Sequence, residues 1–227
     1  MGFTLDQVVP WGRSYDEYVS MFDLSEADLQ RRILGCGDGP AGFNAMLHQR
    51  GGRIVSFDPI YSFSAAQIQS RIAATYETVM AQLRANQSDY LWNVIPSVED
   101  LGRIRMAAMK VFLEDFQAGK GEGRYVAGEL PVLPFADATF DLALSSHFLF
   151  LYSDHLPADF HLRALLDMLR VAAEVRVFPL LTLDGRPSPH LDFVISELSQ
   201  RGFNVTVKAV PYEFQRGGNK MLVVNTL

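Results

Sequence analysis

The chain has 227 residues, a mass of 25.4 kDa and a hydrophobic content of 48%, so it is long enough to bury a full core as one globular domain. Its formal net charge of -6 disfavours a partner bound mainly through phosphate groups, because such proteins usually have a basic face, and we expect a small-molecule ligand rather than bulk nucleic acid. The single cysteine, Cys36, excludes an internal disulfide and a multi-cysteine zinc site, which fits a reducing cytoplasm. The first residues lack the layout of a signal peptide, and no uncharged apolar run reaches the roughly 18 residues of a membrane span, so we expect a cytoplasmic protein without a membrane partner.

The predicted elements begin with one or two short helices over residues 15–30, which should cover one edge of a sheet. A strand is expected at 31–34, followed by a glycine-rich stretch and a helix over 42–50 with apolar side chains on one side. A second strand at 53–57 ends before Pro59, because proline cannot donate to a continuing ladder. These segments predict a parallel strand pair with a helical crossover.

The segment 61–123 interrupts this alternation of strand and helix. Two helices are expected, at about 64–86 and about 97–118, with the aromatic stretch 90–92 between them. Their apolar periodicity points first to packing, through Met80, Leu83, Ile104, Met109, Phe112 and Leu113. We therefore expect an inserted helical hairpin within a single domain of residues 1–227.

The rest of the chain alternates strand and helix and ends in a hairpin. Strands are expected at 124–127, 139–145, 174–178, 203–210 and 221–225, and helices at 155–173 and 190–201. The strand at 139–145 is apolar enough to be buried on both faces. The whole pattern predicts an α/β fold, a Rossmann-like, doubly wound sheet of seven mostly parallel strands with an antiparallel last strand and the inserted helical hairpin.

The stretch ILGCGDGPAGFN, residues 33–44, has Gly35, Gly37 and Gly39 two positions apart between a strand and a helix. Without Cβ atoms the main chain can approach a ligand closely, and we expect the main-chain amides near Gly37 to bind part of that ligand. The spacing is GxGxG rather than the GxGxxG of a dinucleotide site, and the absence of GK[ST] argues against a nucleotide triphosphate loop. Taken alone, the motif is also compatible with a simple tight turn.

Two acidic positions follow the second and third strands. Asp58 lies 23 positions after Gly35, close to the roughly 20 expected for an acid that accepts hydrogen bonds from ribose hydroxyls. Its alternative role is that of a turn former before Pro59. Glu129 follows the third strand between Gly128 and Leu130. All these positions fall at the carboxyl ends of parallel strands, where open α/β sheets bind ligands.

GCGDG at 35–39, DP at 58–59, the segment GELPVLPFADATFDLALSS and the later EVRVFP together resemble the class I S-adenosylmethionine-dependent methyltransferases, over roughly residues 30–60 and 124–227. The resemblance implies methyl transfer from S-adenosylmethionine to a small-molecule acceptor by direct in-line displacement. It implies that the glycine loop contacts the methionine part of the cofactor, that Asp58 binds the ribose and that the segment after the third strand lies at the adenine. The implied cofactor-binding residues are Arg13, Gly35, Cys36, Gly37, Asp38, Asp58, Pro59, Gly128, Glu129, Leu130, Ser145, Ser146 and His147.

The chain departs from this family in two respects. Ile33 stands where members often have an acid, two positions before the first loop glycine, and Asp38 is a nearby source of charge. The insertion at 61–123 is longer than the usual connection and lies outside the resemblance. As a lid or acceptor-binding element over the carboxyl ends of the strands, it would exclude water from the site.

His147 is the candidate catalytic residue, a general base at the end of a strand, although a packed core histidine is an equally good interpretation. Cys36 has no visible His–Asp partner, so we do not expect it to be a nucleophile. His155 and His161 are expected on helix surfaces, and no histidine pair has the spacing and carboxylate support of a metal site. Arg13 either binds the cofactor carboxylate or forms a surface salt bridge.

Tyr90 and Trp92 either line an acceptor pocket or form plain core of the helical hairpin. Two other functions stay open. A non-catalytic S-adenosylmethionine- or nucleoside-binding module is compatible with Ile33. A nicotinamide-dependent oxidoreductase would have a similar loop and strand-end acid, but the GxGxG spacing, the Glu129 region and the terminal hairpin disfavour it.

Overall fold

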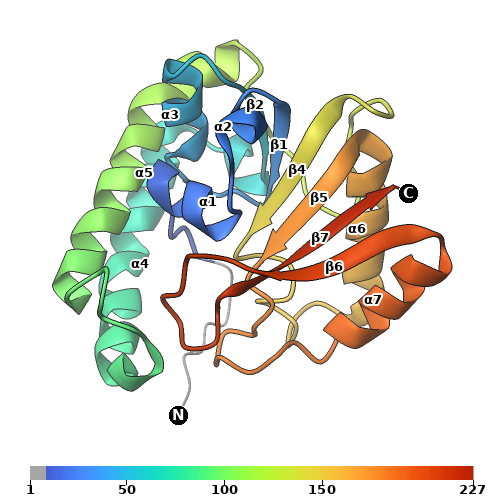
Figure 1. Ribbon diagram of the computed structural model, residues 1–227. Helices are drawn as coiled ribbons and strands as arrows, with labels where there is room; N and C mark the ends of the chain where they lie inside the picture. Colours follow the sequence, from blue (N-terminus) through green and yellow to red (C-terminus); the bar gives the residue numbers. More distant parts are fainter. Residues whose placement is uncertain (1–8, 227) are drawn as a thin grey trace.

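The computed structural model describes residues 9–226; residues 1–8, at the start of the segment without a signal-peptide layout, and Leu227 lie outside the described residues. The strands are β1 (Arg32–Cys36), β2 (Arg53–Phe57), β3 (Tyr125–Val126), β4 (Phe140–Ser146), β5 (Ala172–Phe178), β6 (Phe203–Ala209) and β7 (Lys220–Thr226). They form one seven-stranded sheet in the order β3-β2-β1-β4-β5-β7-β6 (Figure 1). Strands β1 to β5 pair in parallel, and β7 is antiparallel to both β5 and β6. The predicted fold class is therefore confirmed.

The helices cover both faces of the sheet. They are α1 (Tyr15–Met21), α2 (Glu26–Leu29), α3 (Phe43–Gln49), α4 (Ala65–Ala85), α5 (Val98–Gly121), α6 (Ala158–Val171) and α7 (Leu191–Gln200), with short 3₁₀ helices η1 (Pro59–Ser62) and η2 (Gln87–Asp89). Within the described residues, no helix combines the length and the apolar character needed to cross a bilayer.

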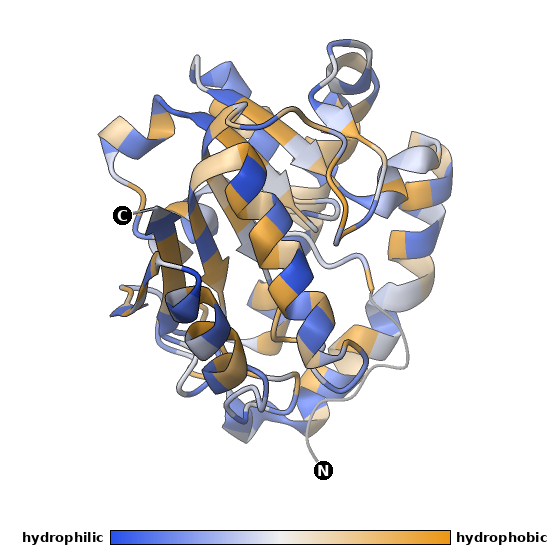
Figure 2. Ribbon diagram, turned by 90° about the vertical axis from the view of Figure 1, so that its right-hand side faces the viewer, coloured by the Kyte–Doolittle hydropathy of each residue, from blue (hydrophilic) through white to orange (hydrophobic). Residues whose placement is uncertain are grey.

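Successive residues of a strand point to opposite faces, and this alternation builds two cores. Leu34 and Ala143 pack against α6 and α7, whereas Ile33 and Leu142 pack against α1 and α3. Figure 2 looks onto the side of α6 and α7, where hydrophilic and hydrophobic residues alternate along the helices. Both faces of the central strands are therefore buried, as the apolar sequence of β4 predicts.

Several element boundaries differ from the sequence prediction by a few residues, and two of them have a clear physical reason. β1 continues to Cys36 instead of ending at Leu34, because Gly35 and Cys36 extend the parallel ladder opposite Ser56 and Phe57 of β2. The glycine stretch therefore begins inside the strand. α6 begins at Ala158 rather than near residue 155, since its N-cap position is Pro157, a residue that cannot continue a helix from upstream.

The two predicted helices between β2 and β3 are present as α4 and α5. Each begins at a serine whose side chain accepts a hydrogen bond from the third helical residue, Ser64 for α4 and Ser97 for α5. α5 packs against both α3 and α4, and the two long helices α4 and α5 run side by side along one margin of the molecule (Figure 1). At its carboxyl half, α5 inserts Phe112 and Phe116 between the rings of Tyr61 and Tyr125, which joins the helix pair to the edge of the sheet.

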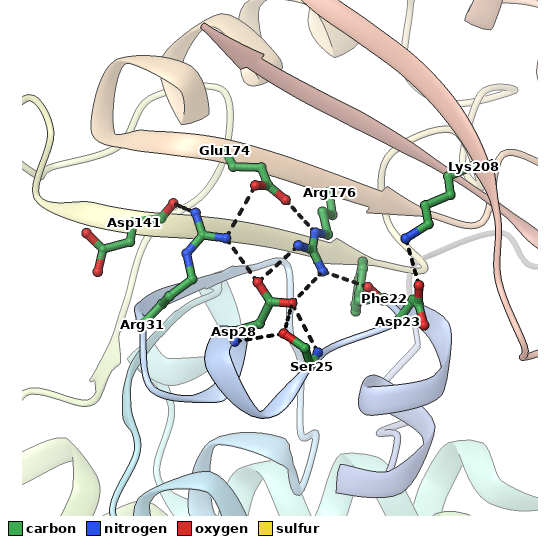
Figure 3. Close-up of polar contacts among 9 residues, drawn as sticks. All are labelled: Phe22, Asp23, Ser25, Asp28, Arg31, Asp141, Glu174, Arg176 and Lys208. Carbon is green, nitrogen blue, oxygen red and sulfur yellow. Dashed lines mark hydrogen bonds and ion pairs between the residues drawn. The ribbon is translucent and has the colours of Figure 1, made fainter.

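A network of ion pairs joins α2 to the sheet near the amino ends of β4 and β5 (Figure 3). The guanidinium of Arg176 donates to Glu174 at 2.6 Å and to Asp28 at 3.1 Å, and Arg31 donates to the same two carboxylates at 3.3 and 3.1 Å. Burial opposes ionisation of Asp28, but hydrogen bonds from Ser25 and the charges of the arginines prevail and lower the pKa of Asp28 to about 2. This network is structural, because it lies at the end of the sheet opposite the ligand-binding edge.

Candidate functional site

A cavity of about 840 Å³ lies at the carboxyl ends of β1 to β4, bordered on its outer side by α4 and α5. This volume lies within the range of about 300–1,000 Å³ typical of ligand sites. Ten of the thirteen predicted site residues line it, namely Arg13, Gly37, Asp38, Asp58, Pro59, Gly128, Glu129, Leu130, Ser146 and His147. The fold therefore gathers segments that are far apart in the sequence around one space.

The other three predicted residues lie behind the wall of the cavity. Cys36 is fully buried in the core beneath α6 and α7, and burial raises the pKa of its thiol well above the usual value, so the thiol is neutral and enclosed. Ser145 is fully buried on β4. Gly35 makes space, because a Cβ at this position would overlap the carboxylate of Asp38. The side chains of Cys36 and Ser145 therefore cannot contact a ligand in the cavity.

The carboxylate of Asp38 folds back beneath the glycine loop. It accepts hydrogen bonds from the Tyr18 hydroxyl at 2.9 Å and from the Ser56 hydroxyl at 2.6 Å. Burial raises the pKa of Asp38 to about 6, against the lowering effect of these two bonds. Ile33 packs in the apolar core on the side of α1 and α3. The acid of this region is thus Asp38 of the loop. The strand position that often has an acid in the resembled family is the apolar Ile33.

Asp58 has the turn-forming role that its position before Pro59 allows, and it also lies in the cavity wall. One oxygen accepts from the Ile60 amide at 2.9 Å, which caps the 3₁₀ helix η1, and the other accepts from the Gly39 amide at 2.8 Å. The residue also lines the cavity, and burial raises its pKa to about 6 against these two hydrogen bonds. Each oxygen keeps a further acceptor position for a ligand hydroxyl, because a carboxylate has about four lone-pair sites.

The glycine loop differs from the sequence prediction in its hydrogen bonding. The Gly37 amide donates to the Phe57 carbonyl at 2.9 Å, which continues the β1–β2 ladder, and the Gly39 amide is bound to Asp58. The amides of Gly37 and Gly39 are thus used within the protein, and ligand binding by main-chain amides near Gly37 stays a prediction for the other positions of the loop. Glycine is favoured at position 37 for two reasons. Its φ of 68° lies in the left-handed region, and a Cβ there would lie 3.0 Å from the Phe148 side chain. The loop thus supplies room and shape at the cavity wall.

His147 lies at the end of β4 in the left-handed region, with φ at 54°, and its amide donates to the Phe178 carbonyl at 2.7 Å. Its Nδ1 is 2.9 Å from the Ser146 hydroxyl, and its ring packs edge-on to Phe178. Burial, followed by the charges of Arg13 and Arg105, lowers the pKa of His147 well below its usual value. The imidazole is therefore neutral at pH 7 and a weaker base than a solvated histidine.

The structure adds a buried ionic group that the sequence analysis did not single out. Arg105 of α5 forms an ion pair with Glu17 of α1, and Tyr212 donates to the same carboxylate at 3.0 Å. Although burial opposes it, the charge of Arg105 lowers the pKa of Glu17 to about 2. The sequence did contain a signal for the burial of Arg105, because this residue lies one helical turn after Leu101 and one before Met109, on the buried stripe of α5.

Arg13 lines the cavity near this group. Its Nη1 donates to the Trp11 carbonyl at 2.6 Å, and within residues 9–226 it has no ion pair, which contradicts the alternative of a surface salt bridge. Burial, and then the neighbouring charge of Arg105, lower the pKa of Arg13 to about 10. Within the described part of the chain, the guanidinium is therefore a cation without an ion-pair partner.

The two histidines that were expected on helix surfaces, His155 and His161, lie in different surroundings. His161 is fully buried and stacks on Phe150 at 5.2 Å, so the expectation of a surface position is wrong; it lies on the inward stripe of α6. His155 is exposed, in the turn that precedes α6. In the part of the chain that the structure describes, no group of three His, Cys, Asp or Glu side chains is arranged to hold a metal ion.

Tyr90 and Trp92 both pack against Phe214, at ring-centroid distances of 4.9 and 5.3 Å. Tyr90 also lines the cavity, whereas Trp92 is not among the lining residues. Tyr90 therefore belongs to the core of the helical hairpin and also lines the cavity, whereas Trp92 belongs to the core alone.

The strand order with β7 antiparallel is the Rossmann-like, doubly wound arrangement that the sequence predicts, with a cavity at the carboxyl ends of its parallel strands. Over 221 residues, the chain is 32% identical to the uncharacterized protein MJ0045 of Methanocaldococcus jannaschii, with 97% of each protein covered. The protein belongs to the same family as this archaeal protein. No family model matches the chain.

Two solved structures are also similar. One is magnesium protoporphyrin IX methyltransferase from Synechocystis PCC 6803 with bound S-adenosylmethionine, at 10% identity and a TM-score of 0.48, covering 94% of this chain and 78% of that one. The other is the PH0226 protein from Pyrococcus horikoshii OT3, at 11% identity and a TM-score of 0.48, covering 94% of this chain and 91% of that one.

Proposed function

We propose that this protein transfers a methyl group from S-adenosylmethionine to a small-molecule acceptor. The main supporting observation is the position of Asp58, a buried carboxylate at the end of β2, beside a glycine loop and within a cavity that extends well beyond them. The glycine-loop end of this cavity has the groups needed for a nucleoside, and its other end has room for a second ligand.

The chain's own residues fit the cofactor at that end. Asp58 would accept hydrogen bonds from both ribose hydroxyls, and Glu129 and Leu130 would border the adenine after β3. Gly37 and Gly128 leave space in the wall, because a Cβ at Gly128 would overlap the ring of Phe57. Ser146 and His147, at the end of β4, would face the methionine part.

Bound S-adenosylmethionine would supply a methyl group that its sulfonium already activates. The protein would then need only to align the acceptor lone pair with the S–CH₃ bond and to exclude water. His147, which is neutral and faces the cavity, would accept the proton from an acidic hydroxyl of the acceptor. For an amine that is already neutral, desolvation by the apolar wall would suffice.

The helical segment 61–123 would form the acceptor wall. Ile68, Val79 and Leu83 of α4 and Leu101 of α5 line the cavity opposite the carboxyl ends of the strands. These side chains would exclude water from the reacting atoms, which supports a function as lid and acceptor-binding element within one domain.

The proposal is tested in two steps. S-adenosylhomocysteine should bind with micromolar affinity by calorimetry and raise the melting temperature, whereas NAD should do neither; the reverse pattern would favour an oxidoreductase. S-adenosylmethionine should then be converted to S-adenosylhomocysteine in the presence of an acceptor panel. Cofactor binding with no turnover on any acceptor class would instead favour a non-catalytic binding module.

A further inference from the structure

The cavity is lined by both acidic and basic side chains. Its acidic lining residues, within the described chain, are Asp38, Asp58 and Glu129, and its basic lining residues include Arg13, Arg71 and Arg105. A ligand in the cavity therefore meets cationic as well as anionic groups.

The two guanidinium groups share a single carboxylate. Glu17 pairs with Arg105 and also accepts hydrogen bonds from Tyr212 and Ser14. Among residues 9–226, the Nε atoms of both Arg13 and Arg105 are buried without a hydrogen-bond partner, and the side chain of Arg105 is 1% exposed. A buried cation with an unmet donor is costly unless an anion pairs with it, so the arginine pair is suited to an anionic group of a ligand.

The surroundings of the arginine pair are apolar and aromatic. Leu101 lies one turn before Arg105 on α5 and lines the same cavity, as do Val79 and Leu83 of α4. Arg13 lies close enough to Tyr90 and Tyr152 that its charge offsets part of the rise that burial causes in their pKa values. The arginine pair therefore has apolar side chains of α4 and α5 beside it in the wall of the cavity.

We propose that Arg13 and Arg105 bind a carboxylate of the methyl acceptor, whose remaining body is an apolar or aromatic group held against α4 and α5. This inference rests on the proposed methyl transfer. It assigns Arg13 to a different ligand from the cofactor carboxylate that the sequence resemblance implies, and the experiment below separates the two assignments. The substrates are thus small apolar acids, methylated at an atom near His147 and bound through the carboxylate.

The same anionic chemistry could come from the acceptor or from the aminoacyl carboxylate of the cofactor, and two nucleosides separate these sources. Benzoate and its uncharged counterpart benzamide are titrated by calorimetry, up to millimolar concentrations, into protein saturated with S-adenosylhomocysteine or with 5′-methylthioadenosine, which lacks the aminoacyl group. Benzoate should bind both complexes with affinities within about threefold, and at least about tenfold more tightly than benzamide.

Binding of benzoate only to the 5′-methylthioadenosine complex would assign the arginines to the cofactor and overturn the inference. Equal affinity for acid and amide, or no benzoate binding to either complex, would also overturn it. Failure of both nucleosides to bind would instead refute the proposed function itself, so the two failures are distinguishable.

A variant pair tests the residues directly. Arg13→Met removes the cation that has no ion-pair partner within the described part of the chain, and it should abolish the preference for benzoate over benzamide while changing S-adenosylhomocysteine affinity less than threefold. Arg103→Met, an exposed arginine on the same helix as Arg105, is the matched control and should leave the preference intact. Loss of S-adenosylhomocysteine affinity in Arg13→Met with the benzoate preference retained would contradict the inference.

Discussion

Replacement of Asp58 by alanine is the sharpest test of the nucleoside end of the cavity. The carboxylate is held by two main-chain amides, at 2.8 Å from Gly39 and 2.9 Å from Ile60, so its orientation is fixed before a ligand arrives. Hydrogen bonds to a charged group contribute about 1.5–3 kcal/mol each in favourable cases. Two bonds from a ribose diol, weakened by partial solvent access, should contribute about 2–3 kcal/mol together.

This free energy corresponds to a loss of about 30- to 150-fold in affinity. Calorimetric titration of adenosine and 2′-deoxyadenosine into wild type and Asp58→Ala gives a thermodynamic cycle that isolates the contact. Wild type should prefer adenosine by at least about tenfold, and the variant should bind both nucleosides almost equally. Circular dichroism serves as the control for folding, because the substitution also removes the acceptor of the Gly39 amide.

The pH dependence provides a second observation on the same residue. Burial raises the pKa of Asp58 to about 6, and only the ionised carboxylate accepts from both hydroxyls. Affinity for adenosine in the wild type should therefore fall as the pH decreases through about 6. An unchanged nucleoside affinity in Asp58→Ala would refute the whole assignment of this end of the cavity.

Three further substitutions test other parts of the structure. Gly35→Ala should lower the free energy of unfolding by about 1–3 kcal/mol in urea titrations, because its methyl group would overlap the carboxylate of Asp38, whereas the control Gly121→Ala, with open space around it, should be neutral. His147→Ala should lower kcat for a hydroxyl acceptor at least about 100-fold without weakening cofactor binding, and an unchanged kcat would leave His147 a packing role only. Asp28→Asn should cost about 1–2 kcal/mol at pH 7; since the folded pKa of about 2 lies below the unfolded value, this contribution is fully present above about pH 4 and is lost as the pH falls through 2, so an undiminished difference from wild type at pH 2 would contradict the mechanism.

The parts of the fold that follow local rules could be predicted from the sequence. Alternating apolar strands and helices predict the seven strands, and the serine-capped periodic segments predict α4 and α5. Asp58 could be located because its distance from the glycine loop and its place before Pro59 are both readable along the chain. The boundaries of β1 and α6 were less certain, since ladder extension and capping depend on neighbouring segments.

Contacts between distant segments could not be predicted in this way. Glu17 and Arg105 are 88 positions apart, and Tyr212 reaches the same carboxylate from near the other end of the chain. The direction of the Asp38 carboxylate depends on Tyr18 and Ser56, which the fold brings beneath the loop. Which distant side chains meet is decided by tertiary packing, and the pattern of a single sequence does not show which segments come together.

The segment before α1 lies directly on the glycine loop: the Arg13 carbonyl accepts from the Gly42 amide at 2.9 Å, and a single added carbon at Gly12 would collide with the Pro40 carbonyl. Two stretches that are some thirty positions apart therefore order together or not at all. A ligand that fastens the loop should shield the peptide bond after Arg13 from trypsin, so the rate of this one cleavage would report occupancy of the cavity without any substrate being known.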